Sequence, residues 1–461
     1  MEIKTVTLFV LLVFISAFTL KAQLKPDYYN AADSIIYHSL SEQKGYHWLG
    51  ELCGIGPRLS GSENLNKAVE WSRKKIESLG LEVWLQPVMV PHWERGKFES
   101  AEIVSTGAHK KLIIAALGGS VNTPEEGITA GVIEVKTFEE LEKRKDEVKG
   151  KIVFFNHPLD PSLVSPFKGY EDVVKFRSRG AIEAAKYGGA GLLICSITSR
   201  YDNVPHTGGM RKYDPMYGKI PAAALGFRDA VYLSSALLEN PSLQINLKLD
   251  CKTFLDVLSY NIVTEIKGSK YPDEIVLVGG HIDSWDKGTG AHDDGAGCMQ
   301  ALEVLDLFKR LNITPSRTIR CVLFANEENG VRGALAYGRY SDSLSVKHIA
   351  SIESDRGAFT PVGFEFDADS AHKSEVIEKL NAMLPVLKKA GIEWIKEGEG
   401  GVDISFINKV NAHIGYAPDE QRYFDVHHSD NDVYEAVNPR EMQLGTAAIA
   451  ILTYLISEEG L

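Results

Sequence analysis

Two loops of the sequence place imidazole and carboxylate side chains directly after apolar runs. The first loop, His281–Gly297 (HIDSWDKGTGAHDDGAG), follows the apolar run Ile275–Val278 and leads into a helical pattern. The second loop, Asn326–Gly330 (NEENG), follows the apolar run Ile319–Ala325. Apolar runs of this length are typical of buried strands, and ligands of α/β folds gather at the carboxyl ends of such strands. The two loops together therefore predict a metal centre.

The residue types in these loops match the needs of a hydrolytic zinc centre. Such a centre requires imidazole and carboxylate ligands, a bridging carboxylate if two metals are bound, and a free carboxylate that handles the proton. His281 is a candidate ligand, and Asp283 is expected to point the same way and to hydrogen-bond the other imidazole nitrogen. One aspartate of Gly290–Gly295 (GAHDDG) is expected to bridge two metals. Glu327 and Glu328 are adjacent and so point to opposite sides, which allows one to bind metal and the other to face water.

Each of these motifs also has a common structural explanation. A His-x-Asp sequence is often a satisfied polar pair, Asp-Asp-Gly is often a turn, and Glu-Glu is usually a solvated surface. The shared placement after buried strands favours the metal, because a charged cluster at such a place needs either solvent or a counter-ion.

Taken with two later segments, these motifs resemble the co-catalytic di-zinc exopeptidases, a family that includes bacterial aminopeptidases and a carboxypeptidase Q branch. The later segments are Ile352–Asp355 (IESD) and His427–Asp432 (HHSDND). The resemblance is closer to the carboxypeptidase Q branch, and it covers nearly the whole chain after the first residues. The motifs that carry this closer match are Ile55–Ser62 (IGPRLSGS), Leu85–Trp93 (LQPVMVPHW), Ser259–Glu274 (SYNIVTEIKGSKYPDE) and the paired histidines near the end.

The resemblance implies five ligands for two Zn²⁺ ions and two further catalytic residues. The ligands are His281, Asp293, Glu328, Asp355 and His428. Asp293 would bridge both ions, His281 and Asp355 would complete one position, and Glu328 and His428 the other. Glu327 would be the general base, and Asp283 would orient His281. The family also implies a cis peptide bond between Asp293 and Asp294.

Two of these expected ligands have a neighbour in the sequence of a similar type. His428 is preferred to His427 because the closing ligand of the family precedes a hydroxyl residue and has an aspartate, here Asp432, four positions later. His427 is expected beside the site or at the surface. Asp355 is preferred to Glu353, which we expect to lie within the strand.

The chain of 461 residues has room for two or more domains. Alternating strand and helix patterns predict an α/β fold with a central mixed β-sheet flanked by helices, formed by residues 23–107 and 255–461. Residues 108–254 contain short β-like segments between turns and no cluster of metal ligands. We assign them to an inserted β-rich domain, which the resemblance implies is a protease-associated domain.

Two helix starts are well marked in the sequence. Ser62 is the expected N-cap of a helix that stops at Gly80. Asn438 is the expected N-cap of the last helix, with Pro439 in the first turn and Glu441 three residues after the cap.

The net charge of the chain and its amino-terminal residues indicate where the protein acts and which partners are excluded. The net charge of −12 argues against nucleic acid and against a role at a membrane surface. Lys4 and the apolar run from Val6 to Leu20 predict a signal peptide, residues 1–22, cleaved near Ala22. The apolar run is shorter than the roughly 20 residues of a spanning helix. We therefore expect export to the periplasm or the medium, without stable membrane insertion.

The five cysteines are too few and too scattered for a disulfide scaffold. Cys298 and Cys321 lie in apolar patterns and are expected to be buried thiols. The sequence leaves open one bridge among Cys53, Cys195 and Cys251.

These observations predict a secreted zinc metallo-exopeptidase that hydrolyses dipeptides or short peptides in the manner of carboxypeptidase Q. An aminopeptidase is the alternative within the same class, because the motifs do not say which end of the peptide is recognised. From other classes, a non-catalytic binding protein on a peptidase fold and a single-zinc cyclase resembling glutaminyl cyclase remain open. The relatives are commonly homodimers, so the resemblance implies a homodimer.

Overall fold

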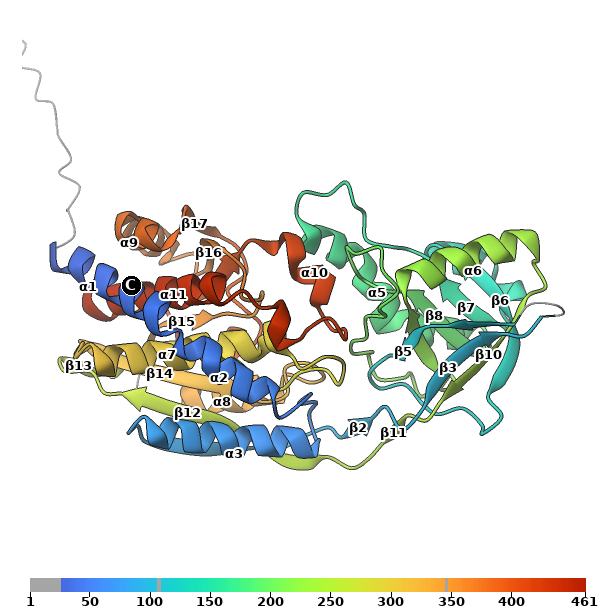
Figure 1. The fold of residues 1–461 in the computed structure, drawn as a ribbon, viewed down its shortest axis with the longest axis horizontal. Helices are drawn as coiled ribbons and strands as arrows, with labels where there is room; N and C mark the ends of the chain where they lie inside the picture. Colours follow the sequence, from blue (N-terminus) through green and yellow to red (C-terminus); the bar gives the residue numbers. More distant parts are fainter. Residues whose placement is uncertain (1–25, 106–108, 345–346) are drawn as a thin grey trace, which may run out of the picture.

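The computed structural model describes residues 26–105, 109–344 and 347–461, so the expected signal peptide lies outside the described residues. Two mixed β-sheets, each with its own helices, lie side by side along the long axis of the molecule (Figure 1). The first sheet belongs to the expected peptidase domain and the second to the insertion. The predicted α/β fold with a central mixed sheet flanked by helices is confirmed.

The first sheet has the strand order β1-β12-β14-β13-β15-β18-β16-β17. Its four central strands, β14, β13, β15 and β18, are parallel, and β1, β12 and β16 add antiparallel neighbours. The strands are β1 (Val83–Val90), β12 (Val257–Ile266), β13 (Tyr271–His281), β14 (Arg317–Phe324), β15 (Lys347–Glu353), β16 (Pro361–Asp367), β17 (Trp394–Glu397) and β18 (His413–Pro418). Because the central strands are parallel, their carboxyl ends meet at one edge of the sheet.

Helices cover both faces of this sheet. One face carries α1 (Pro26–Glu42), α2 (Lys44–Cys53), α3 (Glu63–Ser78), α7 (Ala296–Arg310), α9 (Lys373–Leu387) and α11 (Pro439–Glu459), which share the largest apolar core of the described residues. The opposite face packs on α8 (Arg332–Ser343) and on the short segment around Ile404. Burial on both faces explains why the central strands are continuous apolar runs in the sequence.

Both predicted helix starts are confirmed. The Ser62 side chain accepts a hydrogen bond from the Leu65 amide at the start of α3. The Asn438 side chain accepts from the amides of Arg440 and Glu441 at the start of α11. Each cap satisfies backbone donors that the first helical turn leaves free.

The second sheet has the strand order β4-β3-β10-β6-β7-β8-β9-β5. Its strands are β3 (Glu99–Ile103), β4 (Lys110–Leu112), β5 (Ile114–Ala116), β6 (Ile128–Val135), β7 (Ile152–Phe155), β8 (Gly191–Cys195), β9 (Ala222–Leu225) and β10 (Gln244–Leu249). Helices α4 (Phe138–Lys143), α5 (Pro166–Lys186) and α6 (Phe227–Glu239) accompany it. Strand β3 lies before residue 108, the expected start of the insertion, and nevertheless pairs within this sheet. Helix α5 has 21 residues, although only its last part has a clear helical pattern in the sequence.

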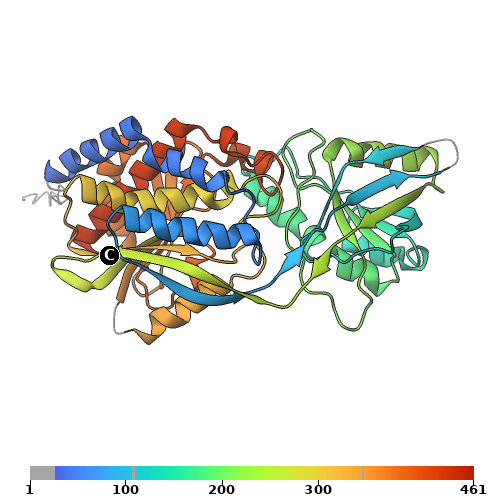
Figure 2. The ribbon, with the colours of Figure 1, turned by 60° about the horizontal axis from the view of Figure 1, so that its bottom comes forward.

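The chain crosses between the two sheets twice, and the two crossings pair with each other. Strands β2 (Trp93–Glu94) and β11 (Lys252–Thr253) form a two-stranded antiparallel ribbon at the junction (Figure 2). The two passages therefore restrain one another through backbone hydrogen bonds.

A second contact between the two parts is aromatic. Helix α10 (Tyr423–Val426) follows β18 and packs on α5 of the insertion (Figure 1). Phe167 stacks on Tyr423 with ring centroids 5.2 Å apart, and Tyr170 stacks on Phe424 at 5.1 Å. The residues that immediately follow α10 are the paired histidines, so this contact fixes them against the insertion.

All five cysteines are buried and unpaired, so the bridge that the sequence left open does not form. Among the described residues, no helix combines the length and the apolar character that crossing a bilayer requires.

Replacing Ser62 by Ala should lower the free energy of unfolding by about 1 kcal/mol, because the Leu65 amide loses its acceptor. Urea unfolding followed by circular dichroism measures the change. Ser78→Ala is the matched control, since Ser78 is exposed at the other end of α3 and bonds only within its own turn. Equal unfolding curves for the two variants would contradict the capping role.

Candidate metal centre

The predicted ligands lie just beyond the carboxyl ends of the four parallel strands. His281 is the last residue of β13, Glu328 follows β14 and Asp355 follows β15. His428 follows β18 by way of α10, and Asp293 lies in the loop between β13 and α7. Residues separated by up to 147 positions therefore converge because their strands share one edge of the sheet.

The Asp293 carboxylate lies between two separate groups of side chains. One oxygen, Oδ1, is 3.3 Å from His281 Nε2, which is also 3.3 Å from Asp355 Oδ1. The other oxygen, Oδ2, is 3.2 Å from His428 Nε2, which is 3.1 Å from Glu328 Oε2. All five predicted ligands are thus brought together, with Asp293 shared by both groups.

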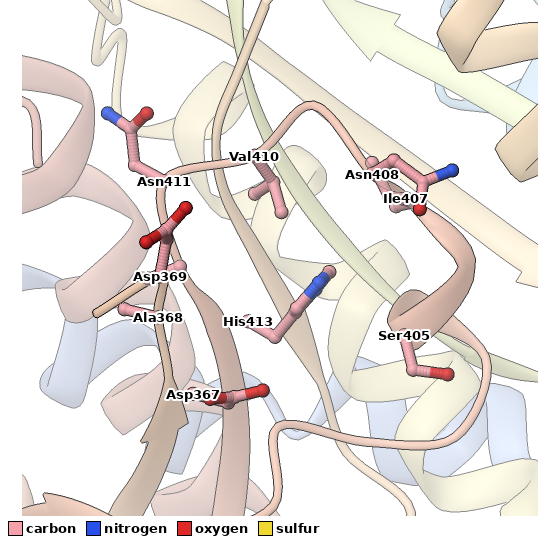
Figure 3. Close-up of a pocket in the computed structure, with 10 residues that line it drawn as sticks. Asp367, Ala368, Asp369, Ser405, Ile407, Asn408, Val410, Asn411 and His413 are labelled. Carbon is pink, nitrogen blue, oxygen red and sulfur yellow. The ribbon is translucent and has the colours of Figure 1, made fainter. Parts of the chain in front are cut away.

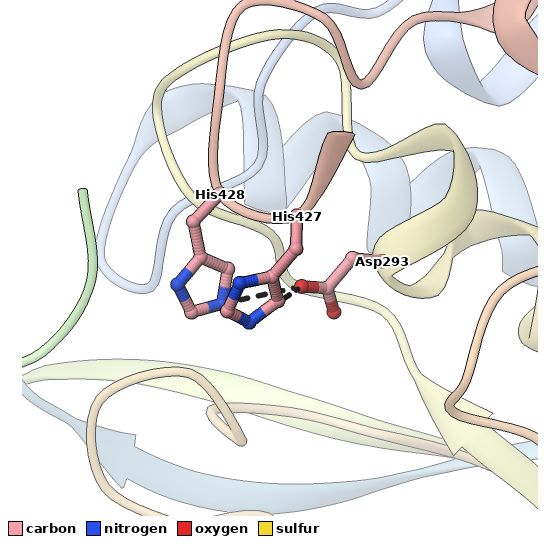
Figure 4. A group of neighbouring side chains, drawn as sticks. All are labelled: Asp293, His427 and His428. Atoms are coloured by element: carbon pink, nitrogen blue, oxygen red, sulfur yellow. Dashed lines mark ion pairs between the residues drawn. The ribbon is translucent and has the colours of Figure 1, made fainter. Parts of the chain in front are cut away.

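His427 lies beside this site and not at the surface. Its ring stacks on that of His428 with centroids 3.5 Å apart, and its Nε2 is 3.9 Å from Asp293 Oδ2 (Figure 4). Its side chain is only 7 % exposed. His428 is therefore the nearer of the two imidazoles to the shared carboxylate.

The donor set fits metal ions. Two groups of ligand atoms, each within 4.8 Å of one another, are formed by His281, Asp293 and Asp355 and by Asp293, His427 and His428. The buried Oδ2 atom of Asp293 accepts no well-formed hydrogen bond in the described structure, although His428 is close. A buried carboxylate oxygen without a partner is costly, and imidazole with carboxylate is the ligand chemistry of zinc.

Burial and mutual repulsion perturb the titration of the cluster. Burial, together with the Asp293 charge, raises the pKa of Glu328 to about 7. Burial opposes protonation of His428, but the carboxylates of Glu328 and Asp293 outweigh it and raise the pKa of His428 to about 9. The pKa of Asp293 is lowered despite its burial, because the imidazoles of His281 and His428 lie close to its two oxygens. The site thus concentrates negative charge that two cations would neutralise.

Asp283 contacts His281 through its backbone carbonyl and not, as predicted from the sequence, through its carboxylate. His281 Nδ1 donates to the Asp283 backbone carbonyl at 3.0 Å, while the nearest carboxylate oxygen of Asp283 is 3.9 Å away. The carboxylate instead accepts from the Glu327 amide and from Ser60 Oγ, each at 3.0 Å. Asp283 therefore fixes the His281 tautomer through its backbone, and its side chain ties together the two loops that carry candidate ligands.

Backbone contacts position the loop that carries Asp293. The Asp432 carboxylate accepts from the amides of His292 at 2.7 Å and Asp293 at 3.2 Å. The peptide bond between Asp293 and Asp294 is cis, as the resemblance implies. The Asp294 carboxylate accepts from the amides of His281 at 2.9 Å and Gly297 at 3.1 Å, so it joins the end of β13 to the start of α7.

Arg58 is a positioning residue that the sequence analysis did not single out. It is fully buried, and its guanidinium donates to the backbone carbonyls of Ile282, Thr289 and Gly290. It thereby holds both ends of the loop that precedes Asp293. The signal available in the sequence was an arginine inside the IGPRLSGS motif, but its partners lie more than 220 positions away.

A separate cavity of about 210 Å³ lies elsewhere on the same domain (Figure 3). Asp367, Asp369 and His413 contribute to its lining, and His413 is the first residue of β18. It therefore lies at the amino end of that strand and includes none of the predicted ligands.

Comparison with known proteins shows which family the chain resembles. Residues 261–453 match the model of peptidase family M28. The chain is 38 % identical to human carboxypeptidase Q over 435 residues, which cover 94 % of this chain and 89 % of that protein. The chain belongs to peptidase family M28. The match spans both the residues of the metal centre and the insertion.

Two solved structures share the fold of this chain. A peptidase M28 precursor from Shewanella amazonensis superposes with a TM-score of 0.86 at 34 % identity, covering 94 % of this chain and 97 % of that one. A zinc aminopeptidase from Bacillus subtilis shares the fold, with a TM-score of 0.61 at 20 % identity over 89 % of this chain and 95 % of that one. As a member of peptidase family M28, the chain is a metallopeptidase, and the two groups of side chains around Asp293 are its candidate metal-binding groups.

Zinc binding to the metal-free protein should release protons near neutral pH. His428, with a pKa of about 9, is protonated at about pH 7, and Glu328, with a pKa of about 7, is about half protonated. Both must lose their protons to bind metal, so the number released should fall as the pH rises past about 9. Titration calorimetry in buffers of different ionisation enthalpy measures this number. A binding enthalpy that does not depend on the buffer would contradict the assignment.

Proposed function

We propose that this chain is an exported, co-catalytic di-zinc exopeptidase that hydrolyses dipeptides or short peptides, as the resemblance to carboxypeptidase Q implies. The observation that carries the proposal is the shared Asp293 carboxylate, whose two oxygens each face a different imidazole. Asp293 would bridge two Zn²⁺ ions, with His281 and Asp355 on one and Glu328 and His428 on the other. Two such ions would polarise the scissile carbonyl and make a water more acidic.

The two adjacent glutamates differ in a way that suits two roles. Glu328 is oriented by contacts, since one oxygen accepts from the Trp285 amide at 3.1 Å and the other is 3.1 Å from His428 Nε2. Glu327 is partly exposed, and within the described part of the chain its carboxylate accepts no hydrogen bond. Glu328 is therefore the ligand and Glu327 is free to meet water and substrate.

Glu327 would act as the general base. Burial, followed by repulsion from Asp355 and Glu328, holds the pKa of Glu327 well above its usual range, which makes the carboxylate a stronger base. It would take a proton from the attacking water and deliver it to the leaving amine. Asp283 would keep Glu327 in place by accepting from its backbone amide at 3.0 Å.

Several further features belong to the same proposal. Removal of residues 1–22 as a signal peptide, a protease-associated role for the insertion and a homodimeric state follow from the resemblance. Release of N-terminal residues, as an aminopeptidase does, is the alternative specificity. A peptide-binding protein without turnover and a single-zinc cyclase are the alternatives of other classes. Metal content together with turnover separates these two alternatives from a di-zinc peptidase.

The direct test is zinc content per chain, measured beside hydrolysis of unblocked, N-blocked and C-blocked dipeptides. We expect about two zinc ions per chain and cleavage that stops on chelation and returns on addition of zinc. One zinc ion per chain would indicate the cyclase, and no cleavage of any dipeptide by zinc-loaded protein would indicate a binding protein. The blocked substrates report which end of the peptide is recognised.

Replacing Glu327 by Gln should lower kcat by about 1,000-fold and leave the zinc content unchanged, because the amide cannot accept the proton. Asp293→Ala is the informative counterpart, since loss of the shared ligand should empty both metal positions. Steady-state kinetics and metal analysis on the same preparations separate the two effects. A metal-loaded Glu327→Gln variant with normal turnover would exclude Glu327 as the base.

A further inference from the structure

A buried arginine of the insertion lies against the metal centre without an anionic partner. Arg177 belongs to α5, is 7 % exposed, and its Nη1 is 3.4 Å from Nδ1 of His428. Its Nη2 donates to the Tyr170 hydroxyl at 2.6 Å. Its Nε is buried and has no hydrogen-bond partner. Within the described ranges, Arg177 forms no ion pair with a carboxylate.

Three other arginines of the described ranges, with side chains that are at most 10 % exposed, have acceptors for their guanidinium groups. Arg95 pairs with Asp286, and Arg320 pairs with Glu265 at 2.7 Å. Arg58 has no carboxylate partner but donates to three backbone carbonyls. Arg177 has five N–H groups and a single neutral oxygen as acceptor. Keeping a guanidinium buried in this state is costly unless an anion occupies the place beside it.

The contact with His428 does not supply an acceptor in the working state of the site. His428 Nε2 faces Asp293 and Glu328, so this nitrogen is the one that would bind metal. A neutral imidazole that binds metal through Nε2 carries its proton on Nδ1. Arg177 Nη1 and His428 Nδ1 would then be two donors 3.4 Å apart, and both would point at the same missing acceptor.

The surrounding backbone makes room for the guanidinium. Gly208 has a φ of +138°, and a Cβ atom at this position would lie 2.6 Å from Cζ of Arg177. The neighbouring Thr207 amide donates to the His428 carbonyl at 2.9 Å, which links this loop of the insertion to the ligand loop. Contacts from both domains therefore fix the position of Arg177 relative to the metal centre.

We propose that Arg177 binds the free α-carboxylate of the substrate, so that this peptidase recognises the carboxyl terminus of its dipeptide or short-peptide substrates. This inference rests on the proposed function and adds the specificity that the motifs leave open. A guanidinium binds a carboxylate through strong charge-assisted hydrogen bonds, and Arg177 Nη1 together with the Nδ1 proton of His428 presents two donors to one carboxylate. The α-carboxylate is the one anion that every unblocked peptide carries, whatever its side chains.

The placement of the charge also favours a carboxylate over the amino group of a substrate. Arg177 and protonated His428 Nδ1 would repel an ammonium group at this position. The carboxylates of the metal centre lie on the opposite side of the His428 ring, at Nε2. The imidazole thus separates an acidic, metal-binding side from a basic side that faces the insertion.

The test compares alanyl-leucine with alanyl-leucinamide, which differ only in the terminal carboxylate. Wild-type enzyme should cleave the free dipeptide with a kcat/KM about 100-fold or more above that of the amide. Arg177→Met should lower kcat/KM about 100-fold for alanyl-leucine, mainly through KM, and leave alanyl-leucinamide within about 3-fold of wild type. Arg177→Lys should be intermediate, because it keeps the charge and loses the planar arrangement of donors.

Arg179→Met is the matched control, because Arg179 lies on the same helix, is 47 % exposed, and pairs with Glu183. It should leave both substrates unchanged. Zinc content and thermal unfolding are measured on every variant, so that loss of metal or of the fold is seen separately. Equal losses for the two substrates in Arg177→Met would show that Arg177 acts through His428 or through the fold, and would overturn the proposal.

The wild-type enzyme provides a test that needs no variant. Equal cleavage of alanyl-leucine and alanyl-leucinamide would exclude carboxylate recognition, while the di-zinc exopeptidase assignment would stand. Absence of cleavage for every unblocked and blocked dipeptide would instead overturn the proposed function itself.

Discussion

The burial of one shared carboxylate is the constraint around which this protein is built. Asp293 lies 5 % exposed between the imidazoles of His281 and His428, and its backbone is held by the buried Asp432. Charges in such a place are stable only with oppositely charged neighbours and well-formed hydrogen bonds. The parallel strands supply the side chains, and the loops between them are tied down by backbone contacts from Arg58, Asp432 and Asp294.

This constraint explains why so many residues near the site are small or polar and yet buried. Gly297 is one case, since a Cβ atom there would lie 1.9 Å from the Ser354 carbonyl oxygen. The close approach of α7 to the end of β15 lets Asp294 accept from the Gly297 amide while Asp355 remains within 3.3 Å of His281. Packing and ligand geometry are therefore parts of the same arrangement.

The insertion contacts the segment that carries His428. Its helix α5 presents aromatic rings to α10 and a guanidinium to His428, and its loop at Thr207 bonds to the His428 carbonyl. A change in the contact between the domains would move His428 and Arg177 together. Ligand geometry and substrate recognition are thus coupled through one short segment.

Local sequence patterns were sufficient for two central strands, two helix starts and the ligand candidates. Apolar runs marked β13 and β14, and the caps at Ser62 and Asn438 were readable because a cap acts within three residues. The candidate ligands were identified by resemblance, since the motifs around them are contiguous. The contact of the Asp283 carboxylate was mispredicted, because extended-strand alternation ignores the turn by which its backbone carbonyl reaches His281 Nδ1.

The sequence by itself determined the central strands β13 and β14, the residue types of the candidate ligands and the family resemblance. Only the tertiary structure decided which distant groups complete the site: Arg58 and Arg177 find their places through contacts across 224 and 251 positions. It also decided that β3 joins the second sheet and that the cysteines stay unpaired. The physical reason is that periodicity and capping act over a few residues, whereas the satisfaction of a buried charge depends on which segments the whole fold brings together.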